Sequence, residues 1–200
     1  MQEASSFVGS YSQAERPRIA FAWNGKHASE FRDANQDFRW AVVTHCLASP
    51  GEATPNLLAD LFLADAEWSA EAWAAPHHFA QLGALLLERG TSEALDPFSV
   101  GFVRSFDTFG ACHAMSLSPQ LLAQLSESAN AAIATATEEP TLNRLVSARD
   151  LLAKLSAGTA SQGWATVSSG TSVSDLQVIW PRWQHRLWQA VKRLLGRNAT

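Results

Sequence analysis

Apolar residues recur at intervals of three and four through most of the chain. This spacing gathers them on one side of a helix, whereas runs with the alternation typical of strands are nearly absent. The pattern therefore predicts an all-α fold. Six helices are expected, at about residues 29–48, 55–66, 76–89, 97–115, 119–136 and 140–156, with a short turn at 69–74 and an irregular segment at 1–28.

The predicted helix starts share one local pattern, an oxygen-bearing residue directly before a proline. It occurs three times, as Thr54-Pro55, Asp96-Pro97 and Ser118-Pro119. The side-chain oxygen can accept a hydrogen bond from the first turn, and a proline there lacks only an N–H that has no helical partner. Gly90 and Gly158 follow Leu-rich segments, where a left-handed residue would end each helix.

Short connections between these helices predict that successive helices pack as antiparallel neighbours in one domain, residues 29–157. In this respect the chain resembles α-solenoids of the HEAT or armadillo kind, and a compact six-helix bundle is the alternative. Residues 158–174 are small, polar and poor in charge, which is typical of a flexible linker. A further helix is expected at 175–197.

This C-terminal helix is predicted to be amphipathic, basic and rich in tryptophan. Its apolar face comprises Trp180, Trp183, Leu187 and Trp188, and its basic margin comprises Arg186, Lys192 and Arg193. An apolar patch of this kind must be buried against something. Docking on the helical domain is the favoured interpretation; a membrane surface and a groove of another protein are the alternatives.

Charge is distributed unevenly along the chain. The net charge is -4, but residues 30–100 hold 11 acidic and three basic residues, while residues 161–200 carry a net charge of +4. The acidic domain disfavours nucleic acid as its partner. Two cysteines, no secretory signal and no apolar run long enough to span a membrane predict a cytoplasmic protein.

One acidic segment is the strongest candidate for a partner-binding face. It combines Asp60, Asp65, Glu67 and Glu71 with Trp68 and Trp73. The plain interpretation is a solvated surface beside a helix junction. The sharper one is a recognition face, because acidic groups around aromatic anchors attract and hold a basic partner; an acid-based active site is a third possibility. Exposed acids contribute little to stability, so lysine at positions 65, 67 and 71 is expected to leave melting nearly unchanged.

Candidate metal and catalytic chemistry is weaker. Three dipeptides pair possible ligands or nucleophiles: His45-Cys46, His77-His78 and Cys112-His113. Neighbours on a helix point about 100° apart, so each pair directs at most one group inward. Zinc-ligand spacings are absent, and Cys112 falls on an apolar stripe where a thiol is normally packing material. We therefore predict two core thiols, no metal and no cofactor.

Taken together, these patterns favour a non-enzymatic protein-binding module. A small, acidic, helical protein of this kind resembles bacterial immunity or antitoxin-type inhibitors, which cover the active surface of a toxin. By that resemblance the partner would be a basic protein, a toxin or effector. The alternatives are an adaptor that tethers a partner to a membrane through the C-terminal helix, and an enzyme that depends on Cys112 and His113.

Overall fold

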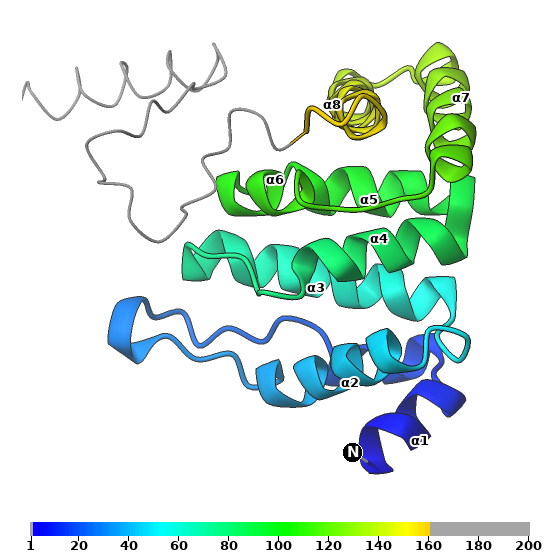
Figure 1. Ribbon diagram of the computed structural model, residues 1–200. Coiled ribbons are helices and arrows are strands. Elements are labelled where there is room, and N and C mark those ends of the chain that lie inside the picture. The colour runs from blue at the N-terminus through cyan, green and yellow to red at the C-terminus, as the bar shows by residue number, and fades with distance from the viewer. Residues whose placement is uncertain (1, 161–200) are drawn as a thin grey trace, which may run out of the picture. The chain divides into compact units, whose positions relative to one another are not determined.

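The chain is all-helical where its structure is described, at residues 2–160 of a computed structural model (Figure 1). In these residues the β-type pairing is a single bridge between Trp23 and Asp33. Eight α-helices follow one another: α1 Gln2–Ser10, α2 Gln36–Ala48, α3 Pro55–Ala72, α4 Phe79–Gly90, α5 Leu95–Phe102, α6 Phe106–Cys112, α7 Pro119–Thr135 and α8 Glu139–Ser156. Three short 3₁₀ helices, η1 Gln13–Arg18, η2 Ala28–Glu30 and η3 Thr91–Ala94, join some of them.

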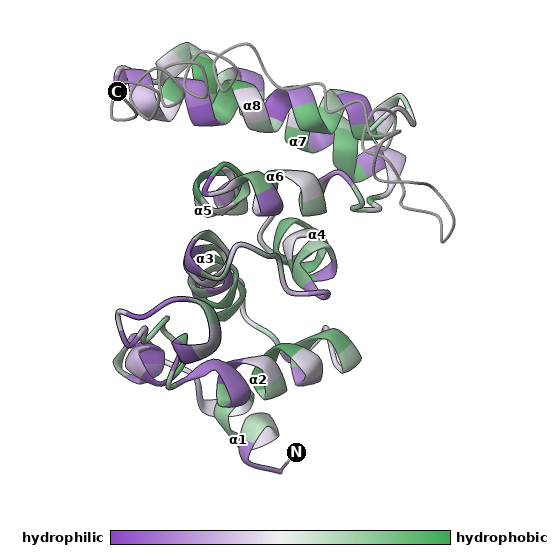
Figure 2. Cartoon of the chain, turned by 90° about the vertical axis from the view of Figure 1, so that its left-hand side faces the viewer, coloured by the Kyte–Doolittle hydropathy of each residue, from purple (hydrophilic) through white to green (hydrophobic). Residues whose placement is uncertain are grey.

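The helices are stacked in layers that follow the order of the chain (Figure 1). Helix α1 packs on α2, α3 packs on both α4 and α5, and α8 packs on α5 and α7. Figure 2 views α3, α4 and α5 nearly end on and α8 along its length, so α8 runs across α5. Each layer buries its apolar side chains against the next one.

A row of phenylalanines forms the centre of the core. Phe62 stacks on Phe79 and on Phe98, with ring centroids 4.5 and 5.6 Å apart, and all three are fully buried. Gly101 leaves room for this row, because a Cβ atom there would lie 2.5 Å from Cε1 of Phe62. The close approach of α5 to α3 thus requires glycine at position 101.

Two of the three predicted helix starts are confirmed. Thr54 accepts from the Leu57 amide, and Ser118 accepts from the Leu121 amide. Asp96 lies instead inside the first turn of α5, and its carboxylate pairs with Arg144 at 3.0 Å. Gly158 follows α8 with a φ of 66°, as predicted, but the positive φ near the end of α4 belongs to Thr91 rather than to Gly90.

Several predicted boundaries differ from the structure. The N-terminal segment contains α1, the helix expected from residue 29 begins at Gln36, and α3 continues through the expected turn at 69–74 to Ala72. The helix expected at 97–115 is two helices, α5 and α6, because Ser105 caps a new first turn in a reciprocal arrangement with Thr108. The apolar spacing continues across this break and hides it.

In the described part of the chain, no helix is both long and apolar enough to cross a bilayer. The predicted linker beyond residue 160 and the predicted helix at 175–197 lie outside the described residues. This also applies to the candidate docking residues Trp180, Trp183, Arg186, Leu187, Trp188, Lys192 and Arg193.

Candidate protein-binding site

The six predicted partner-binding residues lie on α3 and directly after it, but they do not share one face. Asp60, Asp65 and Trp68 turn inward, whereas Glu67 and Trp73 are exposed and Glu71 is half-buried. The structure thus divides the predicted face into an internal half and an external half.

Asp65 belongs to the internal half, and the expectation that it is exposed is wrong. Its side chain is fully buried, and it lies 2.7 Å from both Nε of Arg39 and Nε2 of His78. The indole N–H of Trp40 donates to the same carboxylate at 3.1 Å. A lysine there would place a second cation against Arg39, so the prediction of unchanged melting does not hold for this position.

Arg39 connects this carboxylate to a second one. Its Nη2 lies 2.7 Å from Oδ2 of Asp33, and both side chains are fully buried. Asp33 also accepts from the backbone amides of Ala22 and Asn35 through Oδ1. We refer to Asp33, Arg39, Asp65 and His78 as the buried ion cluster; it joins the loop before α2, α2 itself, α3 and the turn before α4.

Asp60 forms a separate internal connection. It accepts from the Tyr11 hydroxyl at 2.5 Å and from Nε2 of Gln13 at 3.0 Å, and it pairs with Arg16 at 3.0 Å. Burial, followed by the hydrogen bond to Asp60, raises the pKa of Tyr11 well above its usual range. Asp60 therefore holds the segment after α1 against α3, and its carboxylate is not available on an acidic surface.

The tryptophans divide in the same way as the acids. Trp68 donates its indole N–H to Oε1 of Gln36 at 2.8 Å and makes edge contacts with Phe31 and Trp40. Trp23 donates to the backbone carbonyl of Lys26, and Trp40 donates to Asp65. Among the tryptophans of residues 2–160, Trp73 alone donates its indole N–H to no protein group.

Trp73 ends α3 in a conformation that is unusual for its residue type. Its backbone is left-handed, with φ 56° and ψ 40°, and its amide closes the helix by donating to Ser69. Glycine normally occupies such a position, because a Cβ atom costs about 1 kcal/mol there. The side chain is nevertheless a tryptophan, and 81% of its surface is exposed.

Two unpaired acids precede it in the last two turns of α3. Glu67 and Glu71 are one turn apart, a spacing at which like charges repel, and neither makes an ion pair or hydrogen bond within residues 2–160. Helix α3 has no basic residue in its last turn. The partial negative charge of the helix C-terminus therefore adds to that of the carboxylates. We refer to Glu67, Glu71, Trp73 and the exposed His77 as the Trp73 corner.

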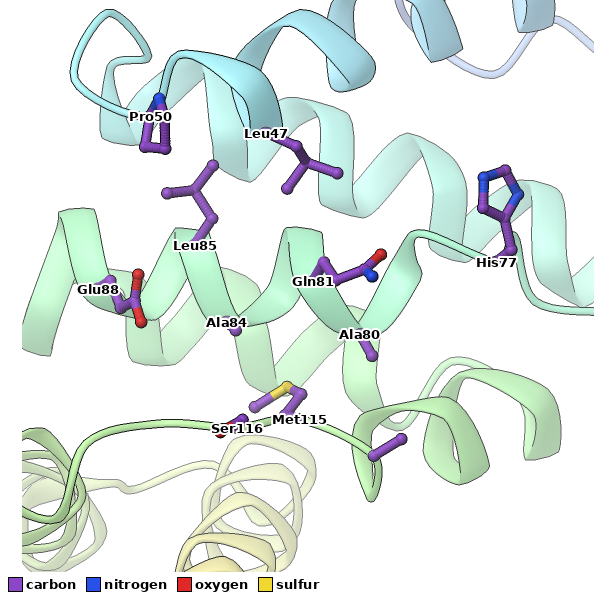
Figure 3. A pocket seen from close by; sticks show the side chains of 11 residues that line it. Leu47, Pro50, His77, Ala80, Gln81, Ala84, Leu85, Glu88, Met115 and Ser116 are labelled. Atoms are coloured by element: carbon purple, nitrogen blue, oxygen red, sulfur yellow. The ribbon is translucent and has the colours of Figure 1, made fainter. Parts of the chain in front are cut away.

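A shallow groove of about 420 Å³ meets this corner at His77 (Figure 3). Its floor is a stripe of α4 with the small residues Ala80 and Ala84, and Figure 3 shows Leu47 and Pro50 on one side and Met115 on the other. Gln81, Leu85, Glu88, Ala114 and Ser116 complete the lining. The groove is lined by His77, four residues after Trp73 in the chain, and its mostly apolar floor adds to the surface that a partner could cover.

The candidate nucleophile and metal ligands are placed differently. Cys46 and Cys112 are fully buried, which confirms that both thiols pack in the core. Burial raises the pKa of Cys46 to about 12 and that of Cys112 further still, so neither thiol readily forms the reactive thiolate. His113 lies 2.8 Å from the Phe109 carbonyl, and burial lowers its pKa.

No group of three or more metal-ligating side chains is placed to hold an ion within residues 2–160. The His77-His78 pair illustrates why: His78 turns inward to Asp65, while His77 lies on the surface. Comparisons with protein-family models, curated proteins and solved structures find no match to this chain.

Proposed function

We propose that this chain is a non-enzymatic protein-binding module that contacts its partner through the Trp73 corner. The observation that carries the proposal is Trp73 itself, a tryptophan 81% exposed at a left-handed helix end. Tryptophan is enriched among the residues that dominate binding energy in protein interfaces. A large exposed ring with no internal partner is the kind of anchor that such interfaces use.

The local energetics support this interpretation. The left-handed backbone disfavours tryptophan, the ring remains in water, the two glutamates repel each other, and Glu71 lies at the negative end of the helix dipole. The left-handed backbone, the repulsion and the dipole lower the stability of the isolated chain, and the exposed ring adds nothing to it. Sites that bind partners commonly carry residues that do not favour stability.

A second exposed apolar side chain enlarges the same end of the layered domain. Val103 lies in the junction between α5 and α6 and is 37% exposed. Both α5 and α6 pack on α3, and Figure 1 places α6 at the same end as the C-terminus of α3. The proposed surface therefore extends from the Trp73 corner towards this junction.

In its narrower form, the proposal is an immunity or antitoxin-type inhibitor that covers a basic toxin or effector. Helix layers that follow the chain order suit a HEAT-like solenoid, whose edge would carry the corner. The membrane-tethering adaptor depends on the C-terminal segment and stays a separate prediction. An enzyme based on Cys112 is less favoured because its thiol is buried and its pKa is raised.

The test is capture of a partner by the intact chain from the native organism. The baits are wild type, Trp73→Ala and the double variant Glu67→Gln/Glu71→Gln. The control is Glu127→Gln/Glu138→Gln, which makes the same charge change at exposed positions on and beside other helices. One protein retained by wild type and control but lost with Trp73→Ala supports the proposal; retention by all four baits contradicts it.

The captured protein then tests the narrower form. An inhibitor should abolish the activity of its partner at a one-to-one ratio, and association should slow as salt increases. A captured protein whose activity is unaffected by saturating chain would contradict the inhibitor function and leave the binding function in place.

A further inference from the structure

We infer that Asn24 is a modification site, at which spontaneous deamidation irreversibly opens the long loop before α2 (Figure 1). We refer to residues 22–34 as the Asn24 loop; the inference does not depend on the Trp73 corner. Among the asparagines of the sequence, Asn24 alone precedes a glycine. Gly25 has no side chain to hinder its backbone nitrogen, and both residues are exposed to water.

The reaction needs only water. The backbone nitrogen of Gly25 loses its proton to solvent base and attacks Cγ of Asn24. The bond from Cγ to the side-chain nitrogen breaks, and that nitrogen takes up a proton and leaves as ammonia. Water then opens the five-membered imide at either carbonyl, which gives aspartate or isoaspartate. The Gly25 amide donates to no protein group within residues 2–160, so no hydrogen bond retains its proton.

The closed loop protects Asn24 through three hydrogen bonds. Its Oδ1 accepts from the backbone amides of Lys26 and Arg32 at 3.1 and 3.2 Å, and its Nδ2 donates to the Glu30 carbonyl at 2.7 Å. Attack on Cγ turns the planar side-chain amide into a tetrahedral centre, which displaces both of these atoms. Asn24 should therefore react mainly when the loop opens locally.

The loop requires the same glycine that makes Asn24 reactive. Gly25 has a φ of 74°, in the left-handed region that disfavours other residues. A Cβ atom there would meet nothing within 4 Å, so the backbone conformation and not the available space requires glycine. The reactive dipeptide is thus part of the turn that closes the loop.

Conversion removes the donor that holds the loop closed. Because Oδ1 of Asn24 faces two backbone N–H groups, its nitrogen must face the Glu30 carbonyl. After hydrolysis an oxygen replaces that nitrogen, and two oxygen acceptors repel each other at such a separation. Isoaspartate also adds a methylene group to the backbone. The converted loop therefore cannot close as before.

The base of the loop connects it to the buried ion cluster. Trp23 forms the β-bridge with Asp33, and the Ala22 amide donates to Oδ1 of Asp33 at 3.0 Å. The other carboxylate oxygen of Asp33 holds Arg39. Conversion at Asn24 should therefore loosen the segment that positions a buried carboxylate.

The experiment ages the intact chain at mildly alkaline pH, where the Gly25 nitrogen loses its proton more readily. Peptide mass spectrometry follows deamidation and isoaspartate at every asparagine. Asn24 should convert first. It should nevertheless convert about ten-fold more slowly than in the free peptide of residues 20–30, because the closed loop protects it.

A pair of variants tests whether loop closure sets the rate. Trp23→Phe keeps an aromatic ring beside Phe21 but removes the indole hydrogen bond to the Lys26 carbonyl, so it should speed conversion by about three-fold or more. Tyr11→Phe removes a hydrogen bond to Asp60, outside the loop, and should leave the rate within about two-fold of wild type.

Hydrogen exchange then measures the opening. The amides of Asn24 and Ala34 donate to the Arg32 and Ala22 carbonyls at 3.0 Å, and they report whether the loop is closed. Converted chains, separated by their additional negative charge, should exchange these amides about five-fold faster than unconverted chains. Asn24→Asp, made directly in the full chain, should show the same direction of change.

Four results would overturn the inference. They are no isoaspartate at Asn24, earlier conversion of another asparagine, equal rates in the intact chain and the free peptide, and equal exchange in converted and unconverted chains. None of these requires a variant to fold. Equal rates for Trp23→Phe and Tyr11→Phe would contradict the role of loop closure.

Discussion

The internal and external halves of the predicted face carry the same kinds of residue in opposite environments. In the inner half, Asp65 and Trp68 are held by Arg39, His78 and Gln36. In the outer half, Glu71 and Trp73 have no such partners within residues 2–160. An acidic and aromatic sequence therefore indicates either an internal framework or a contact surface, and only the partners of each side chain distinguish the two.

The difference has an energetic meaning. Charges buried at zero exposure must be paired, because an isolated buried charge is very unfavourable. Removing any member of the buried ion cluster leaves another buried charge without its partner, so we expect each such substitution to lower the free energy of unfolding. The Trp73 corner carries local features that lower stability, so substitutions there should be neutral or stabilising. The sign of the stability change separates the two regions experimentally.

The largest effect is expected at Asp65. Asp65→Asn keeps the shape of the side chain but leaves Arg39 buried with one carboxylate, and removing one member of a buried pair costs about 3–5 kcal/mol. Urea denaturation should show a loss of this size. Glu67→Gln, an exposed change two residues away, is the control and should change the unfolding free energy by less than about 0.5 kcal/mol. Equal effects of the two changes would contradict the comparison.

Part of this division could have been predicted from the sequence. Asp65 lies three residues after Phe62 and four after Leu61, on the apolar stripe of its helix. Arg39 lies three residues before Val42 and four before Val43, again on a buried stripe. A charged residue at a position with this spacing indicates a buried, paired charge. The all-α fold and the two proline-containing helix starts follow from the same kind of pattern.

Other features leave no local signal. Arg39 and Asp65 are 26 residues apart, and Asp33 lies in a loop, so the contacts among them depend on how the layers stack. The exact end of α3 is also hard to place: Pro76 shows that the helix stops before it, but the Ala- and Glu-rich segment favours a helical backbone up to that point, and Trp73 is not a residue that normally ends one. The expected turn at 69–74 includes Trp73 but begins too early, inside α3, which continues to Ala72.

The second effect concerns the inner tryptophan. Trp68→Phe removes the hydrogen bond to Gln36 and part of the contact with Phe31 and Trp40, so it should destabilise the chain by about 1–2 kcal/mol. Thermal and urea unfolding should both report the loss, while partner capture should remain intact at low temperature. A stability loss below about 0.5 kcal/mol would mean that Trp68, like Trp73, contributes little to the stability of the fold.

The third effect has the opposite sign. Trp73→Gly should stabilise the chain by about 0.5–1 kcal/mol, because glycine adopts the left-handed backbone without the penalty of a Cβ atom. Trp73→Ala keeps that penalty and should be nearly neutral, so the pair isolates the backbone contribution. Both variants should lose partner binding. Destabilisation by either one would mean that the ring is packed against the chain and is not an external anchor.

The smallest effect concerns charge at the helix end. Glu71→Lys replaces an acid at the negative end of the α3 dipole with a base and converts its repulsion from Glu67, four residues earlier, into attraction. The two contributions together should raise the unfolding free energy by about 0.5 kcal/mol at low salt and by less at 0.5 M salt. The same charge change at Glu127, inside α7 and away from a helix end, should give a smaller gain. If Glu71→Lys stabilises the chain and also weakens capture of a basic partner, the corner has kept an unfavourable acid for binding. If it destabilises the chain at low salt, the Glu71 carboxylate makes a stabilising contact within the chain, and Glu71 does not belong to the Trp73 corner.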